Sequence, residues 1–169
     1  MNEFYKIKPE EVRKIISEEI IKGPTAGMCA GYVQANLAIL PKKYADDFKA
    51  FASKNPKSCP VLEVLDEGSV FTKVSAKNAN IATDIPKYRI YRNGEFVEEC
   101  FNIEKYWQDD FVSFLIGCSF TFESALLDAG IGKDIYSFYD NGIKQPYFSI
   151  VAKNSDTDKK EIFIEQIEK

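Results

Sequence analysis

The chain has 169 residues, of which 45% are hydrophobic and 14% aromatic, a balance typical of a folded domain rather than a disordered segment. Its 22 basic and 26 acidic residues give a net charge of −4, and no basic stripe is visible, so we expect no nucleic-acid partner. The sequence contains no histidine, which excludes the commonest general base, the commonest zinc ligand and any Ser-His or Cys-His nucleophile pair.

The sequence shows no sign of a membrane or export address. No run approaches the roughly 18 apolar residues of a membrane span, and the N-terminal MNEFYKIKPEE lacks the apolar core of a signal peptide. The cysteines have no CxxC spacing, so we expect reduced, mostly buried thiols. These are Cys29, Cys59, Cys100 and Cys118. We therefore expect a cytoplasmic protein without a metal site or a membrane partner.

Helices and strands are expected to interleave in the first half of the chain. Apolar spacing after Pro9 predicts a helix to about Ile21, and Gly23-Pro24 ends it. Alternation predicts a strand over Tyr32–Leu40, with a helix as the alternative. The next elements follow from the same two periodicities. They are a helix over Pro41–Ser53, a short strand over Pro60–Leu65, and a further strand segment over Val70–Val74.

The second half contains one strong turn signal, Asn93-Gly94, which predicts a hairpin between Tyr88–Tyr91 and Glu95–Val97. Aromatic spacing predicts a helix over Ile103–Ile116. The remaining predictions are a helix over Phe122–Ala129 and a terminal hairpin of Tyr147–Ala152 with Glu161–Ile167. The class is therefore α+β, with a mixed α/β sheet as the alternative. We expect one main domain over residues 1–131, with the divergent tail 132–169 packed on it.

The stretch Gly23–Leu40, GPTAGMCAGYVQANLAIL, is the principal candidate for a small-molecule site. Its glycines let backbone N–H groups approach a ligand, and successive N–H groups can bind an anion. Tyr32, Gln34 and Asn36 are predicted to share one strand face, where amides suit the mixed polarity of an amino acid. A plain glycine-rich turn with a solvated strand face explains the same pattern. The spacing matches neither a P-loop nor a Rossmann fingerprint, which argues against a nucleotide.

A second candidate segment runs from Gly117 to Glu123, where a thiol, two hydroxyls and a carboxylate stand between two predicted helices. N–H groups at the start of a helix can hold a carboxylate or a developing oxyanion. Helix capping by Ser119 or Thr121 explains the segment equally well, and Cys118 could be a small buried hydrophobic residue.

Two further acidic positions carry weaker predictions. Asp109 and Asp110 are adjacent, and adjacent residues of a helix face different ways, so they make a poor acid/base pair. Glu63 lies in the apolar run PVLEVL. It is either a half-buried carboxylate with a raised pKa or, as we favour, an outward-facing residue of an amphipathic strand.

Four motifs then carry a resemblance to a known family. They are GPTAGMCAGYVQANLAILP, NPKSCPVLEVLDEG, TDIPKYRIYRNGEFVEE and WQDDFVSFLIGCSFTFESALLDAGI. In this order they resemble the putative hydro-lyase family related to D-glutamate cyclase, over roughly residues 11–131. The resemblance implies a cytoplasmic carbon–oxygen lyase without an organic cofactor. For cyclase-like members it implies closure of D-glutamate to 5-oxo-D-proline with loss of water.

Residue chemistry suggests how the roles divide. Thr25, Ala26 and Gly27 are expected to hold the α-carboxylate, with Arg13 as a further anion partner. The amine is expected near Gln34 or Asn36, with Tyr32 beside them. Glu123 is the candidate acid/base, Cys118 and Ser119 complete the catalytic set, and the amides of 117–119 are expected to serve the oxyanion.

Departures from the family pattern leave alternatives open. Cys29-Ala30 stands where the family has Ala-Pro, and the basic residue expected before the loop is replaced at 16–19. The family's C-terminal half is expected to be missing or replaced by the tail. The first alternative to an active lyase is a non-catalytic protein that binds a small carboxylate or amino acid. The second is a truncated relic that folds only as a homo-oligomer.

Overall fold

The structure, a computed structural model, describes residues 3–118, 150–152 and 162–164. Helices and antiparallel strands alternate along these residues, which confirms the α+β class. The helices are α1 (Pro9–Ser17), α2 (Lys42–Lys54) and the short 3₁₀ helix η1 (Glu104–Tyr106). The strands are β1 (Ala35–Pro41), β2 (Val61–Val64), β3 (Tyr88–Arg92), β4 (Glu95–Cys100), β5 (Phe111–Gly117), β6 (Ile150–Ala152) and β7 (Ile162–Ile164).

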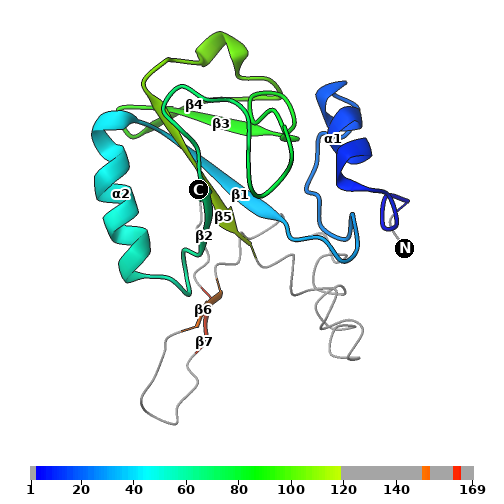
Figure 1. Ribbon diagram of the computed structural model, residues 1–169, viewed down its shortest axis with the longest axis horizontal. Coiled ribbons are helices and arrows are strands. Elements are labelled where there is room, and N and C mark those ends of the chain that lie inside the picture. Colours follow the sequence, from blue (N-terminus) through cyan, green and yellow to red (C-terminus); the bar gives the residue numbers. More distant parts are fainter. Residues whose placement is uncertain (1–2, 119–149, 153–161, 165–169) are drawn as a thin grey trace.

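The central layer is a sheet of strand order β1-β5-β2, with both neighbours antiparallel to β5 (Figure 1). β1 pairs with β5 from Ala35 opposite Gly117 to Pro41 opposite Phe111. The first strand thus begins three residues later than the alternation starting at Tyr32 predicted. β2 confirms the predicted strand, with a register shift between Val61 and Glu63.

The predicted helix over Ile103–Ile116 is wrong, because most of this stretch is extended. After the single turn η1, the chain forms β5, the central strand of the sheet. Phe114 packs on Phe48 of α2, with ring centroids 4.8 Å apart, while Leu115 is buried in a cluster with Ile81. A run buried on both faces shows no clean alternation, so its aromatic residues fall by chance at helical spacing.

The predicted helix over Pro41–Ser53 is confirmed by α2, which begins one residue later. The helix begins directly after β1. Pro41, the residue that joins the two, has no N–H group, so it leaves no backbone donor unpaired at the helix N-terminus. Ala45 and Ala52 are buried against the sheet. Figure 1 shows the chain passing from the lower end of α2 through a short loop into β2.

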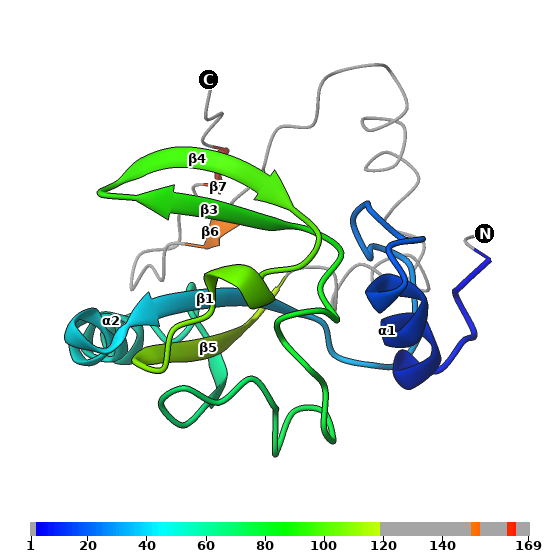
Figure 2. The same cartoon turned by 90° about the horizontal axis from the view of Figure 1, so that it is seen from above.

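The hairpin at Asn93-Gly94 is confirmed, with β3 and β4 paired antiparallel. Asn93 has φ 52° and Gly94 φ 83°, the left-handed values that this kind of turn requires. The hairpin forms a second layer over β1 and β5 (Figure 2). The contact between the layers is a cluster built on Ala82, Tyr88 and Ile103, against which Leu37 and Ile39 of β1 pack.

The helix predicted from Pro9 to Ile21 ends early, at Ser17. Glu19 takes a left-handed φ of 57°, and its N–H donates to the carbonyl of Ile16. The N–H of Ile20 then donates to the carbonyl of Ile15, which completes a Schellman C-cap on a residue other than glycine. This cap turns the chain so that Ile21 joins Val12 and Ile16 in the buried cluster beneath α1.

Val70–Val74 forms no strand, and only Phe71 pairs in an isolated bridge with Asn80. Hydrogen bonds to the side chain of Glu63 in β2 attach this segment to the sheet instead. At the other end of the chain, β6 pairs with β7, in agreement with the predicted terminal hairpin. The predicted helix over Phe122–Ala129 lies outside the described residues.

Gly68 offers a test of the contact between the β2–β3 connection and the start of β5. Its φ is +72°, and a Cβ there would lie 2.8 Å from the carbonyl oxygen of Asp109. We expect Gly68→Ala to lower the free energy of unfolding by more than the roughly 1–2 kcal/mol of left-handed strain alone. Gly31→Ala is the matched control, because its φ is +85° and no described atom lies within 4 Å of the added Cβ. Equal losses in urea denaturation would show that the close approach to Asp109 has no energetic weight.

Candidate functional site

The loop before β1 consists of two successive tight turns. The N–H of Met28 donates to the carbonyl of Thr25 at 3.0 Å, and the N–H of Tyr32 donates to that of Cys29 at 3.1 Å. Gly27 and Gly31 have φ of 71° and 85°. Glycine accepts these values without strain, which explains why the loop needs glycine at both positions.

Gln34 holds this loop together. Its Nε2 donates to the carbonyls of Thr25 at 3.1 Å and Met28 at 3.2 Å, and its Oε1 accepts from the Thr25 hydroxyl at 2.7 Å. Gln34 precedes β1, so it does not share a strand face with Asn36 as predicted. The side-chain amide of Gln34 therefore forms hydrogen bonds within the loop, and the same bonds hold Thr25 in place.

The other predicted binding residues of the loop lie at its surface. The Tyr32 side chain is 51% exposed, and Asn36 is exposed at the start of β1. Ala26 and Gly27 are half-buried within the first turn. The loop therefore presents backbone and one aromatic ring to solvent.

Arg13 is engaged elsewhere, in a largely buried ion pair. Its Nε lies 3.7 Å from Oδ2 of Asp84, with side-chain exposures of 19% and 16%. The same Asp84 oxygen accepts the N–H of Asn80 at 2.9 Å, so the pair joins α1 to the connection before β3. An anion at Arg13 would have to compete with this carboxylate.

The end of β5 carries the described part of the second candidate segment. The N–H of Gly117 donates to the carbonyl of Pro60 at 2.9 Å, and the N–H of Cys118 donates to that of Gln34 at 3.3 Å. Both amides are used by the sheet, so the predicted oxyanion role of Gly117 and Cys118 conflicts with the structure. Ser119, Thr121 and Glu123 lie outside the described residues.

The structure nevertheless places the described start of the second candidate segment, Gly117 and Cys118, beside the first. Ala35 is directly opposite Gly117, and Gln34, the residue that organises the loop, bonds to Cys118. Cys59, which the sequence did not mark as functional, lies one residue from Pro60 at the same end of the sheet. We call this region, made of residues 25–35, 59–60 and 117–118, the sheet end.

Glu63 fits neither prediction made from the sequence. The side chain is 9% exposed and accepts backbone N–H bonds from Lys73, Val74 and Ser75 at 2.7, 3.0 and 2.7 Å. Burial alone would raise the pKa of this carboxyl, but the N–H donors of Ser75, Lys73 and Val74 outweigh it and hold the pKa below its usual value. Glu63 therefore anchors the 73–75 segment as a buried carboxylate, which is a structural role.

Asp109 and Asp110 also differ from their prediction in context. Both are exposed in the turn before β5 rather than on a helix. The Asp110 carbonyl accepts the N–H of Lys42 at the start of α2. Neither carboxylate is close to the sheet end, since they precede the opposite end of β5.

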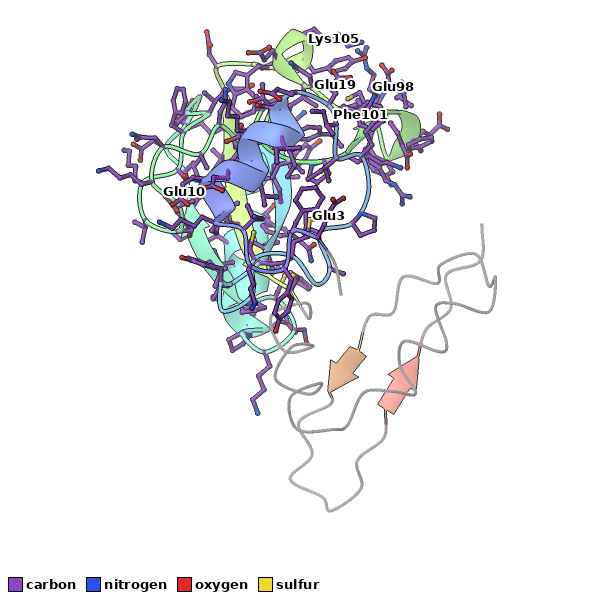
Figure 3. The ribbon with its side chains drawn as sticks, turned by 90° about the vertical axis from the view of Figure 1, so that its right-hand side faces the viewer. Glu3, Glu10, Glu19, Glu98, Phe101 and Lys105 are labelled. Atoms are coloured by element: carbon purple, nitrogen blue, oxygen red, sulfur yellow. The ribbon has the colours of Figure 1, made fainter. Side chains whose placement is uncertain are left out.

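A shallow surface depression of about 610 Å³ lies away from the sheet end, beside the end of β4. Figure 3 shows Glu19, Phe101 and Lys105 gathered there, with Glu98 close by. The Lys22 ammonium lies 4.4 Å from the centroid of the Phe101 ring, and Lys105 lies 3.9 Å from Glu98. The depression contains no predicted site residue, and it is wide open to solvent. We therefore place the candidate site at the sheet end, because the predicted site residues lie there, although the depression lies elsewhere.

In the part of the chain that the structure describes, no group of three or more histidine, cysteine or acidic side chains is placed to hold a metal ion. Among the same residues, no helix combines the length and apolarity needed to cross a membrane.

Several known proteins described as putative hydro-lyases are similar to this chain. A putative hydro-lyase of Clostridium beijerinckii is 58% identical over 129 residues, covering 76% of this chain and 49% of the relative. The putative hydro-lyase YcsI of Bacillus subtilis is 55% identical over 123 residues, which cover 73% of this chain and 48% of the relative. A putative hydro-lyase of Thermoanaerobacter is also 55% identical, over 128 residues that cover 76% of this chain and 48% of the relative. The chain spans about half the length of these curated relatives. No protein-family model matches it.

Proposed function

We propose that the chain is a member of the putative hydro-lyase family, to which its relatives at 55–58% identity point, and that its sheet end binds a small amino acid and takes part in removing water from it. The substrate that the resemblance favours is D-glutamate, closed to 5-oxo-D-proline. One observation carries the proposal: the bond from the Cys118 N–H to the Gln34 carbonyl joins the predicted binding loop to the predicted catalytic segment. These segments are separated by more than eighty residues of sequence.

The reaction sets clear demands on the site. The amine nitrogen of D-glutamate attacks the γ-carboxyl carbon, a C–N bond forms, and a C–O bond breaks. The ammonium nitrogen gives up two of its three protons and keeps one in the lactam, and the departing γ-carboxylate oxygen takes up two protons and leaves as water. A base must take the amine proton, donors must stabilise the oxyanion, and an acid must protonate the leaving oxygen.

We assign the binding part of these demands to the loop. Gln34 holds the turn of Thr25, Ala26 and Gly27 in one conformation, which supports a role for this turn in receiving a carboxylate. Tyr32 and Asn36 are exposed, and we assign them to the amine and the side chain of the substrate. The Arg13 guanidinium stays with Asp84 in this proposal.

The catalytic part is assigned to the segment that begins at Cys118. We assign Glu123 the acid/base role and Ser119 and Cys118 supporting roles beside the γ-carboxyl. The Gly117 and Cys118 amides are committed to Pro60 and Gln34, so oxyanion donors must come from elsewhere, for example the Ser119 hydroxyl or amide.

The test is incubation of the full chain with D-glutamate, with 5-oxoproline measured by mass spectrometry. We expect product formation by the wild-type chain and a loss of about 100-fold or more in Glu123→Gln, the usual scale for removing a general acid/base. Glu95→Gln, an exposed change in the β3–β4 hairpin, is the matched control and should leave the rate unchanged.

Absence of product at high protein concentration would refute the lyase proposal. An upward shift of the melting temperature with D-glutamate, without turnover, would instead support the non-catalytic binding protein, since a ligand stabilises only the state that it binds.

A further inference from the structure

Two cysteines flank a backbone hydrogen bond at the sheet end. The Gly117 N–H donates to the Pro60 carbonyl at 2.9 Å, and Val61 is opposite Ile116 in the antiparallel ladder. Cys59 precedes Pro60 at a bend just before β2, and Cys118 follows Gly117 just after β5. In an antiparallel pair, one step back along one strand matches one step forward along the other, so this register, continued by one residue, would bring the two cysteines together.

No backbone hydrogen bond joins the two residues. The Cys59 N–H donates to the Asn55 carbonyl at 2.8 Å, and the Cys118 N–H donates to the Gln34 carbonyl at 3.3 Å. Facing residues of an antiparallel ladder have Cα atoms about 4.5–5.5 Å apart, and a disulfide spans Cα separations of about 4.4–6.8 Å. A position one residue beyond this ladder would therefore allow the two sulfurs to meet.

The position of this pair differs from that of the other two cysteines. Cys59, Cys118 and Cys100 are half-buried, so a small oxidant can reach them, whereas Cys29 is buried under α1. Burial raises the pKa of Cys29 and of Cys100, which lowers the fraction of the reactive thiolate at each. Cys29 and Cys100 also lie in different parts of the fold.

We propose that Cys59 and Cys118 are a redox pair that closes a reversible disulfide when the protein meets hydrogen peroxide. One thiolate attacks a peroxide oxygen, the O–O bond breaks, and the products are a sulfenic acid and one water. The other sulfur attacks the sulfenic sulfur, the S–S bond forms, and the second water leaves. The thiols lose two electrons and two protons, and the peroxide is reduced to water. A dithiol reductant restores both thiols by exchange.

The disulfide would control the candidate site, a consequence that rests on the proposed function. It would occupy the Cys118 sulfur and fasten the start of β2 to the end of β5, at the point where the binding loop meets the catalytic segment. Oxidised protein should therefore lose hydro-lyase activity and regain it on reduction.

The experiment treats the full chain with hydrogen peroxide, counts remaining thiols with a chromogenic disulfide, and maps cross-linked peptides by mass spectrometry. We expect the count to fall from four thiols to two, a single Cys59–Cys118 cross-linked peptide, and full recovery with dithiothreitol. Cys59→Ser and Cys118→Ser should each abolish the cross-link, whereas the control Cys100→Ser should keep it. Alanine versions of both variants, with circular dichroism, separate a chemical effect from a folding defect.

Another pairing, an intermolecular dimer on a non-reducing gel, or over-oxidation of a single cysteine without a cross-link would each overturn the proposal. Thiol counting and peptide mapping need no turnover, so they stand if the chain makes no 5-oxoproline. If the chain is active, a cross-linked form with unchanged activity would overturn the control of the site alone.

Discussion

Phe114→Ala is expected to lower the free energy of unfolding by about 3–5 kcal/mol, the usual range for deleting a fully buried aromatic ring. Phe114 is 1% exposed at the centre of β5, and its ring meets that of Phe48 edge-on at 4.8 Å. No other side chain joins α2 to the central strand by such a contact among the described residues. Urea denaturation followed by circular dichroism measures the loss.

The matched control comes from α2 itself. Phe51 is 56% exposed, with its ring centroid 6.4 Å from that of Phe48. Phe51→Ala removes the same group from a surface position, so we expect less than about 1 kcal/mol. Similar losses in the two variants would contradict the placement of 111–117 as a buried central strand. They would instead favour the predicted helix over Ile103–Ile116, in which the contact with α2 would be shared among several residues.

Glu63→Gln is expected to cost about 2–3 kcal/mol at neutral pH. The substitution keeps the shape of the side chain but places an amide N–H₂ where one carboxylate oxygen accepts a backbone N–H. One of the donors from Lys73, Val74 and Ser75 is then left without an acceptor in a buried place. Glu67→Gln is the control, since its partner Lys42 is an exposed cation and such solvent-screened pairs contribute little to stability.

The pH dependence of this loss has a definite sign. The folded-state pKa of Glu63 is lowered, so the unfolded chain binds the proton more readily. Its stabilisation is complete above the unfolded value of about 4.3 and is lost as the pH falls through the lower folded value. The difference between wild type and Glu63→Gln should therefore shrink as the pH falls below about 4. A difference that grows in acid would show that Glu63 has a raised pKa, as a half-buried carboxylate without donors would.

Local signals allowed the sequence to predict a good part of this fold. Asn93-Gly94 fixes a hairpin because both residues must take positive φ, and the structure shows those values. The helix after Pro41 follows from spacing that involves only neighbours along the chain. In each case the interactions that decide the structure lie within a few residues.

The parts that the sequence could not predict depend on distant residues. β5 is a strand because β1 and β2 pair with both of its edges, and nothing within 111–117 records this. The low pKa of Glu63 comes from N–H groups ten and more residues away. The proposed pairing of Cys59 with Cys118 depends on the register of β2 on β5, which no residue near Cys59 records. The glycines of the loop led to the prediction that it binds a ligand, but the hydrogen bonds by which Gln34 holds the loop are visible only in three dimensions.

The most direct test of the sheet end as a ligand site is protection of Cys118 from alkylation. Reduced protein is treated with iodoacetamide with and without saturating D-glutamate, and the rate at each cysteine is followed by peptide mass spectrometry. We expect D-glutamate to slow alkylation of Cys118 several-fold while leaving Cys100, at the end of β4, unchanged. Equal rates at Cys118 with and without D-glutamate would contradict the assignment of the binding site to the meeting of the loop with β5.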